Sequence, residues 1–85
     1  MRIALGSDHR GYEGKRHLAP LLKKWGHQVR DFGCDSIRPC DYPDYAGAVA
    51  RAVASGEYDV GILLDGSGIG MSIAANKVIG VRAAL

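Results

Sequence analysis

Apolar residues recur along the chain with two alternating patterns, short continuous runs and a spacing of three to four residues. The runs are typical of strands and the wider spacing is typical of one helix face. The predicted strands are residues 2–6, 27–33, 58–64 and 80–85. The predicted helices are residues 12–25, 41–54 and 71–77. The chain therefore alternates strand and helix from end to end.

This βαβαβαβ order predicts an α/β fold, a parallel sheet with right-handed crossovers and helices on its faces. The third strand is the most apolar, so we expect it at the centre of the sheet, and we place the second strand nearer an edge. Pro20 lies inside the first helical pattern and predicts a kink there. The fourth strand ends uncovered at Leu85. We therefore expect these residues to be the first part of a longer domain.

Composition narrows the class of protein further. The chain has 85 residues, 47% hydrophobic and 24% charged, which is typical of one small globular domain. A net charge of +2 is too small to indicate a nucleic-acid or anionic-membrane surface. No apolar run approaches the length of a membrane span. The two cysteines, Cys34 and Cys40, match no zinc spacing, so we expect free thiols in a reducing cytoplasm.

A glycine-rich turn carries the strongest chemical signal. The segment Asp65-Gly66-Ser67-Gly68-Ile69-Gly70 follows the most apolar strand and precedes a helix. Glycines let backbone N–H groups approach a ligand, and a helix N-terminus adds partial positive charge. This pattern favours binding of a phosphate or a developing oxyanion, with Ser67 as a hydroxyl at the tip. The alternative is a tight strand-to-helix turn that needs glycine for geometry alone. The spacing fits neither a dinucleotide-binding fingerprint nor a Walker A loop.

Two further polar groups belong to the same predicted edge. Asp8 and His9 end the first strand, and carboxyl ends of parallel strands share one edge of a sheet. Their carboxylate and imidazole suit sugar hydroxyls and an anion; the alternative is an exposed Asx-type turn. Tyr42, in Asp41-Tyr42-Pro43, could lean over this edge, although helix initiation alone explains Asp41 and Pro43.

Together these stretches resemble the type B ribose-5-phosphate isomerases and the galactose-6-phosphate isomerase subunits. The matching stretches are Gly6-Ser7-Asp8-His9 with Gly11, Asp41-Tyr42-Pro43 with Tyr45-Ala46, the block from Gly66 to Lys77, and Gly80-Val81-Arg82-Ala83-Ala84. The resemblance implies a Rossmann-like αβα sandwich and a metal-free, cofactor-free aldose–ketose isomerase of carbohydrate metabolism. It also implies a homodimer or homotetramer whose active sites are shared between subunits.

The resemblance further implies residue roles. Asp8 would contact the hydroxyls of a sugar phosphate and His9 its phosphate, while Tyr42 would line the pocket. The backbone of the turn, at Gly66, Gly68, Ile69 and Gly70, would hold the enediolate. Ser67 would move a proton between substrate oxygens O1 and O2.

One departure concerns the base. Many members of this family have a cysteine where this chain has Asp65, and another group has a glutamate where it has Met71. Asp65 is therefore our candidate base, because it follows the apolar strand and precedes the turn. Asp65 could instead orient Ser67 or a sugar hydroxyl. Two other functions stay open, a non-catalytic sugar-phosphate-binding paralogue and a half-domain that is inactive alone.

Overall fold

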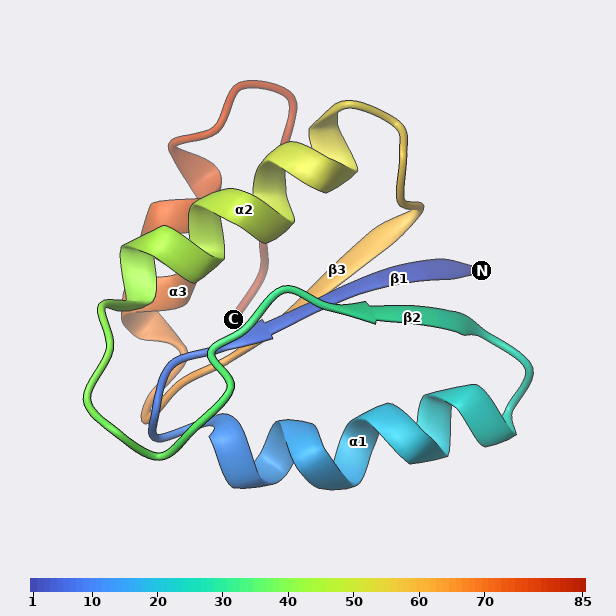
Figure 1. The fold of residues 1–85 in the computed structure, drawn as a ribbon. Coiled ribbons are helices and arrows are strands. Elements are labelled where there is room, and N and C mark those ends of the chain that lie inside the picture. Colours follow the sequence, from blue (N-terminus) through green and yellow to red (C-terminus); the bar gives the residue numbers. More distant parts are fainter.

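The computed structural model describes residues 1–85 and contains three strands and three helices (Figure 1). The strands are β1 (Arg2–Ser7), β2 (Gln28–Asp31) and β3 (Val60–Leu64). The helices are α1 (Tyr12–Lys24), α2 (Tyr42–Ala54) and α3 (Ile69–Asn76). The first six predicted elements are thus confirmed in order and type. The helix α1 continues through Pro20 as one element.

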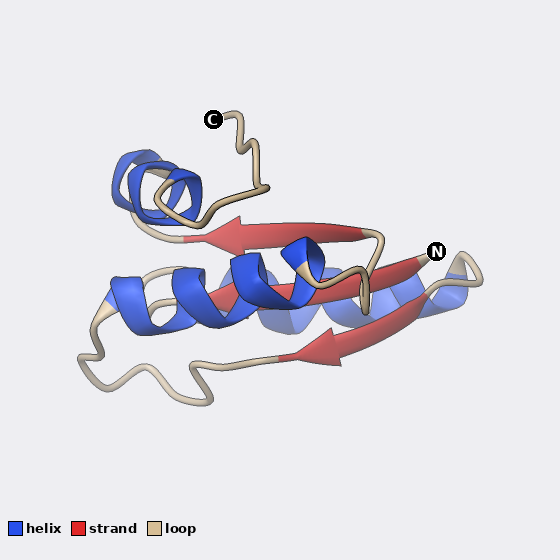
Figure 2. Ribbon diagram, turned by 90° about the horizontal axis from the view of Figure 1, so that it is seen from above, coloured by secondary structure: helices blue, strands red, loops and turns tan.

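The three strands are parallel and lie in the order β2-β1-β3. Helix α1 covers one face of the sheet and α2 and α3 cover the other, which gives three layers (Figures 1 and 2). This arrangement confirms the predicted α/β, Rossmann-like class. The central strand is β1, however, and the prediction that β3 is central was wrong. Five of the six β1 residues are buried, because strands flank β1 on both sides and helices cover both its faces, whereas β3 is only half-buried.

The predicted fourth strand is also wrong, since residues 81–85 form no regular structure. A turn at Val78, whose carbonyl accepts the N–H of Val81 at 3.2 Å, follows α3. The Asn76 side chain then accepts the N–H of Ala83 at 2.9 Å and donates to its carbonyl at 3.0 Å. A side chain therefore satisfies the backbone groups that a ladder with β3 would use.

The core lies mainly between the sheet and α2. Ala46, Val49 and Ala50 of α2 are almost fully buried, as their spacing predicts, and Val49 packs with Ala4 of β1. Helix α1 differs from its prediction. Leu22 is buried, but Trp25 is 62% exposed. No helix is both long and apolar enough to cross a membrane.

Lys15 lies on the buried face of α1, and its side chain is only 1% exposed. Its Nζ donates to Asp31 Oδ1 at 2.8 Å and to the carbonyl oxygen of Cys34, at the end of β2. The aliphatic stem of a lysine packs like an apolar side chain while its ammonium finds acceptors. Lys15 therefore ties α1 to the start of the loop between β2 and α2.

Candidate active site

The candidate site lies where the carboxyl ends of β1 and β3 meet. The chain passes from β1 to β2 on one side and then returns to β3 on the other side of β1, and such switch points form ligand-binding crevices in α/β sheets. Ser7 pairs with Leu64, and the N–H of Asp8 donates to the Leu64 carbonyl at 3.1 Å. Gly11 lies so close to this carbonyl that a side chain would collide with it. The loops that follow β1 and β3 are therefore held side by side.

Asp8 is 7% exposed and organises the start of α1. Its Oδ1 accepts the N–H groups of Arg10 at 2.9 Å and Gly11 at 3.0 Å. This is the Asx-type turn that we weighed as an alternative. The second oxygen, Oδ2, makes no hydrogen bond within the chain and can still accept one from a ligand.

His9 is half-buried and receives a hydrogen bond from the connection between β2 and α2. The backbone N–H of Cys40 donates to His9 Nδ1 at 3.3 Å. Because Nδ1 accepts this bond, a neutral His9 carries its proton on Nε2. His9 therefore presents an N–H donor, which is what an anionic oxygen requires. Nothing in the residue pattern indicated Cys40 as the partner, since only the folded loop brings the two together.

Asp65 accepts three backbone N–H groups of its own turn. Oδ1 accepts those of Ser67, at 3.2 Å, and Gly68, and Oδ2 accepts that of Met71 at 3.3 Å. The carboxylate thus caps the turn and the first turn of α3, and the N–H dipoles stabilise its negative charge. Much of the predicted anion-binding backbone is consequently used by a side chain of this chain.

The rest of the glycine turn is only partly satisfied. Ser67 is exposed, and its Oγ accepts the N–H of Ile69 at 3.2 Å. Gly68 has a φ of 81°, a left-handed conformation that favours glycine. The N–H groups of Gly66 and Gly70 make no hydrogen bond within the chain. These two amides are the ones that the turn leaves for a ligand.

The ring of Tyr42, the first residue of α2, lies against this turn. A Cβ atom on Gly70 would lie 2.8 Å from both Cε1 and Cζ of Tyr42. Only a glycine permits this approach, and the ring stays 39% exposed. The structure therefore brings Tyr42, the first residue of α2, to the turn at Gly66–Gly70 and places Asp8 and His9 together in the neighbouring loop after β1.

One cationic side chain at this edge was absent from our predictions. Arg10 crosses from the loop after β1 to the loop after β3, where its Cδ lies 2.8 Å from the position of a Cβ on Gly66. The signal available in the sequence was only its adjacency to His9.

No group of three or more His, Cys, Asp or Glu side chains is placed to hold a metal ion.

Both cysteines are free thiols, as predicted. Burial, with a hydrogen bond to Cys34 adding to its effect, raises the pKa of Cys40 from its ordinary value of 9.0 to about 11. Burial also raises the pKa of nearby Tyr45, with the charges of Cys40 and Cys34 adding to the effect. Cys40 is therefore a protonated thiol at neutral pH and a poor nucleophile.

A cavity borders the glycine turn at Gly68, on the side of α2. It measures about 430 Å³ and is bounded by β3, α2, α3 and residues 81–85. Its walls are mostly apolar, with Val49 and Leu63 among them, and its polar side chains are those of Asp59, Ser72 and Arg82. We place the functional site at the β1–β3 edge because the convergent polar groups are there.

Fold and site together define an α/β protein with polar groups gathered where two parallel strands end, and comparison with known proteins gives the family. The chain belongs to the Ribose/Galactose Isomerase family, whose model matches residues 3–85. It is 50% identical over 82 residues to ribose-5-phosphate isomerase B of Escherichia coli, covering 96% of this chain and 55% of that protein. It is 45% identical to the galactose-6-phosphate isomerase subunit LacB of Clostridium acetobutylicum, over 100% of this chain and 49% of that one.

Solved structures agree with this assignment. The ribose-5-phosphate isomerase B of Clostridium thermocellum superimposes with a TM-score of 0.97 at 56% identity, covering 99% of this chain and 57% of that one. The enzyme of Thermotoga maritima gives a TM-score of 0.94 at 48% identity, over 98% and 57% of the two chains. The chain thus spans about half the length of the relatives it matches.

Proposed function

We propose that this chain forms part of an aldose–ketose isomerase that converts a sugar phosphate, ribose 5-phosphate or a related one, to its ketose through a cis-enediolate. The observation that carries the proposal is the meeting of Asp8, His9 and the Asp65 turn at one switch point of the sheet. The family supports it, since its named members include ribose-5-phosphate isomerases. The proposed chemistry uses side chains and backbone, without metal or cofactor.

The substrate-binding roles follow from the donor and acceptor atoms that make no hydrogen bond within the chain. The free Oδ2 of Asp8 accepts a hydrogen bond from a sugar hydroxyl, and the Nε2–H of His9 donates to a phosphate oxygen. The Tyr42 ring covers the turn beside Gly70. The exposed Ile69 lines the same edge, and the backbone of Gly66, Gly68 and Gly70 lies beside the reacting carbons.

Isomerisation moves a proton between adjacent carbons, and one base on one face of the enediolate can do both transfers. We assign this step to Asp65, whose Oδ2 accepts a single N–H within the chain and keeps a lone pair for substrate. Ser67, at the exposed tip of the turn, transfers the proton between O1 and O2. The three N–H bonds hold the carboxylate in place for this work.

Substitution of the base tests the proposal directly. Asp65→Asn should lower turnover of ribose 5-phosphate by about 10²–10⁴-fold, the usual contribution of general-base catalysis. The measurement is ketose formation together with exchange of the C2 proton in deuterated water, and circular dichroism checks the fold. Asp59→Asn, at the opposite edge of the sheet, is the matched control and should keep full activity. Equal activity of both variants would show that Asp65 is not the base.

The engagement of Asp65 by three amides favours a second candidate, a sugar-phosphate-binding protein without catalysis. A carboxylate that serves to cap α3 need not remove a proton. Tight binding of ribose 5-phosphate by calorimetry, with no C2 proton exchange, would select this function. Gain of turnover in Asp65→Cys would then show that the scaffold itself can isomerise.

We also propose assembly as a homodimer or homotetramer with shared sites. Ile69 and Ile73, one turn apart on α3, are each 54% exposed beside the glycine turn. A second subunit would cover them. Light scattering coupled to gel filtration should report a mass at least twice that of the chain, and Ile73→Glu should return it to the monomer. A cytoplasmic location stays a prediction.

A further inference from the structure

The side chain of Arg10 lies over the glycine turn without a partner. Its Nη1 is 3.2 Å and its Nε is 3.8 Å from the position of a Cβ on Gly66, the residue next to Asp65. Its guanidinium makes neither a hydrogen bond nor an ion pair within the chain, whereas Arg2 and Arg16 are both paired with carboxylates. Only the backbone N–H of Arg10 is used, in the turn made by Asp8. The guanidinium is thus free to bind an anion.

The turn itself leaves only two backbone donors, the N–H groups of Gly66 and Gly70, for an oxyanion. Asp65 uses the N–H groups of Ser67, Gly68 and Met71, and Ser67 Oγ uses that of Ile69. When Asp65 takes the C2 proton, its carboxylate becomes neutral and the negative charge passes to the enediolate oxygen. A positive group beside that oxygen stabilises the charge as it develops. Gly66 and Gly70 offer two neutral N–H groups, which supply no positive charge.

We infer that Arg10 supplies this positive charge, binding the anionic oxygen at the reacting end of a sugar phosphate. The position of the Arg10 guanidinium indicates which end of the substrate it binds. Gly66 directly follows Asp65, and a base that abstracts the C2 proton lies close to O2 and O1, which are one and two bonds from C2. A guanidinium over Gly66 therefore lies at these oxygens and not at the distant phosphate. This inference rests on the proposed function and extends it by one catalytic residue.

Two stable ligands separate the two ends of the substrate. 5-Phosphoribonate carries a carboxylate at C1, where the enediolate charge develops, and ribitol 5-phosphate has the same phosphate with a neutral C1. The wild-type chain should bind 5-phosphoribonate more tightly, measured by calorimetry. Arg10→Ala should weaken that binding by about 10- to 100-fold, the usual contribution of a charge-assisted hydrogen bond, and change ribitol 5-phosphate binding by less than about 3-fold.

Arg51 of α2 provides the matched control, because its guanidinium is also unpaired but belongs to the last turn of α2. Arg51→Ala should bind both ligands like wild type. An equal loss for both ligands in Arg10→Ala would place Arg10 at the phosphate and overturn the inference. Unchanged binding of both ligands would overturn it as well. Absence of any sugar-phosphate binding by the wild-type chain would instead refute the proposed function, and this inference with it.

Discussion

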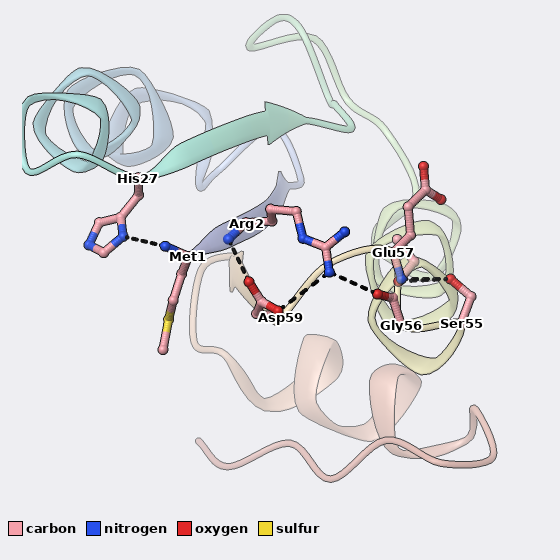
Figure 3. Close-up of polar contacts among 8 residues, drawn as sticks. Met1, Arg2, His27, Ser55, Gly56, Glu57 and Asp59 are labelled. Atoms are coloured by element: carbon pink, nitrogen blue, oxygen red, sulfur yellow. Dashed lines mark hydrogen bonds and ion pairs between the residues drawn. The ribbon is translucent and has the colours of Figure 1, made fainter.

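The aspartates at the two ends of the parallel strands have different partners. At the amino edge, where the strands begin, Asp59 accepts the N–H of Arg2 at 2.7 Å and forms an ion pair with the Arg2 guanidinium at 3.5 Å. This guanidinium also donates to the Gly56 carbonyl (Figure 3). At the carboxyl edge, Asp8 and Asp65 accept only backbone N–H groups. The first arrangement neutralises a cation, and the second leaves the cation Arg10 unpaired.

We interpret the contacts at the amino edge as structural and those at the carboxyl edge as preparing a site. At the exposed amino edge the polar groups pair with one another, and even the N-terminal ammonium of Met1 lies 3.3 Å from His27 Nδ1 (Figure 3). The carboxyl edge fixes its loops through backbone donors, so its side-chain groups stay available. A site that must bind an anion benefits from an unpaired cation, because an internal ion pair would compete with the ligand.

The largest expected effect concerns the thiol at the carboxyl edge. With a pKa near 11, Cys40 should be alkylated by iodoacetamide about 10- to 100-fold more slowly in the folded chain than in urea at neutral pH. Mass spectrometry of the tryptic peptides gives both rates. Equal rates would show that the loop next to His9 is open, and would weaken the contrast between the edges.

A second variant tests the buried cation behind the site. Lys15→Met keeps the packing of the stem but leaves the Cys34 carbonyl without its donor, so the free energy of unfolding should fall by about 2 kcal/mol. Urea denaturation measures it. The control is Arg16→Met in the same helix, whose exposed pair with Glu13 should contribute less than about 0.5 kcal/mol. Equal losses would contradict a structural role of Lys15.

The third prediction concerns the turn made by Asp8. Asp8→Ala removes the acceptor of two backbone N–H groups at the start of α1, and the free energy of unfolding should fall by about 1 kcal/mol. Ser36→Ala, which removes the acceptor of one exposed N–H at Arg38, should cost less than about 0.5 kcal/mol. A neutral Asp8→Ala would mean that this carboxylate serves a ligand alone.

The smallest effect belongs to the amino edge. The N–H of Arg2, with its guanidinium assisting, lowers the pKa of Asp59 below its ordinary value of 3.8. A lowered folded-state pKa stabilises the fold above the unfolded value, and this contribution is lost as pH falls through the folded value. Asp59→Asn should therefore be slightly less stable than wild type at about pH 6, and the difference should vanish at about pH 2. A difference that persists in acid would show that charge is not its origin.

Local patterns were sufficient for most of the fold. The spacing of apolar residues predicted six elements, and Asp41 with Pro43 marked the start of α2 to within one residue. Parallel topology also predicted that the ends of β1 and β3 meet, which placed Asp8 and His9 beside the Asp65 turn. The roles of these residues in binding and catalysis stay predictions.

Other features depend on contacts that the spacing of apolar residues does not show. Lys15 reads as a surface lysine until β2 brings the Cys34 carbonyl to it. The segment at residues 80–85 has strand character, but Asn76 captures the backbone of Ala83 instead. The apolar content of β3 suggested a central strand, but the order of strands depends on which strands pair side by side, and β1 lies between the other two.

The order of residues by itself determined the alternation of strands and helices, the shared edge of Asp8, His9 and the glycine turn, and the family. Those properties arise from periodicity and from motifs, which are local. Only the tertiary structure decided which donors and acceptors are already used, with Asp65 engaged by its own amides and Arg10 left free. Hydrogen bonds of this kind depend on distances of a few tenths of an ångström, which no spacing along the chain encodes.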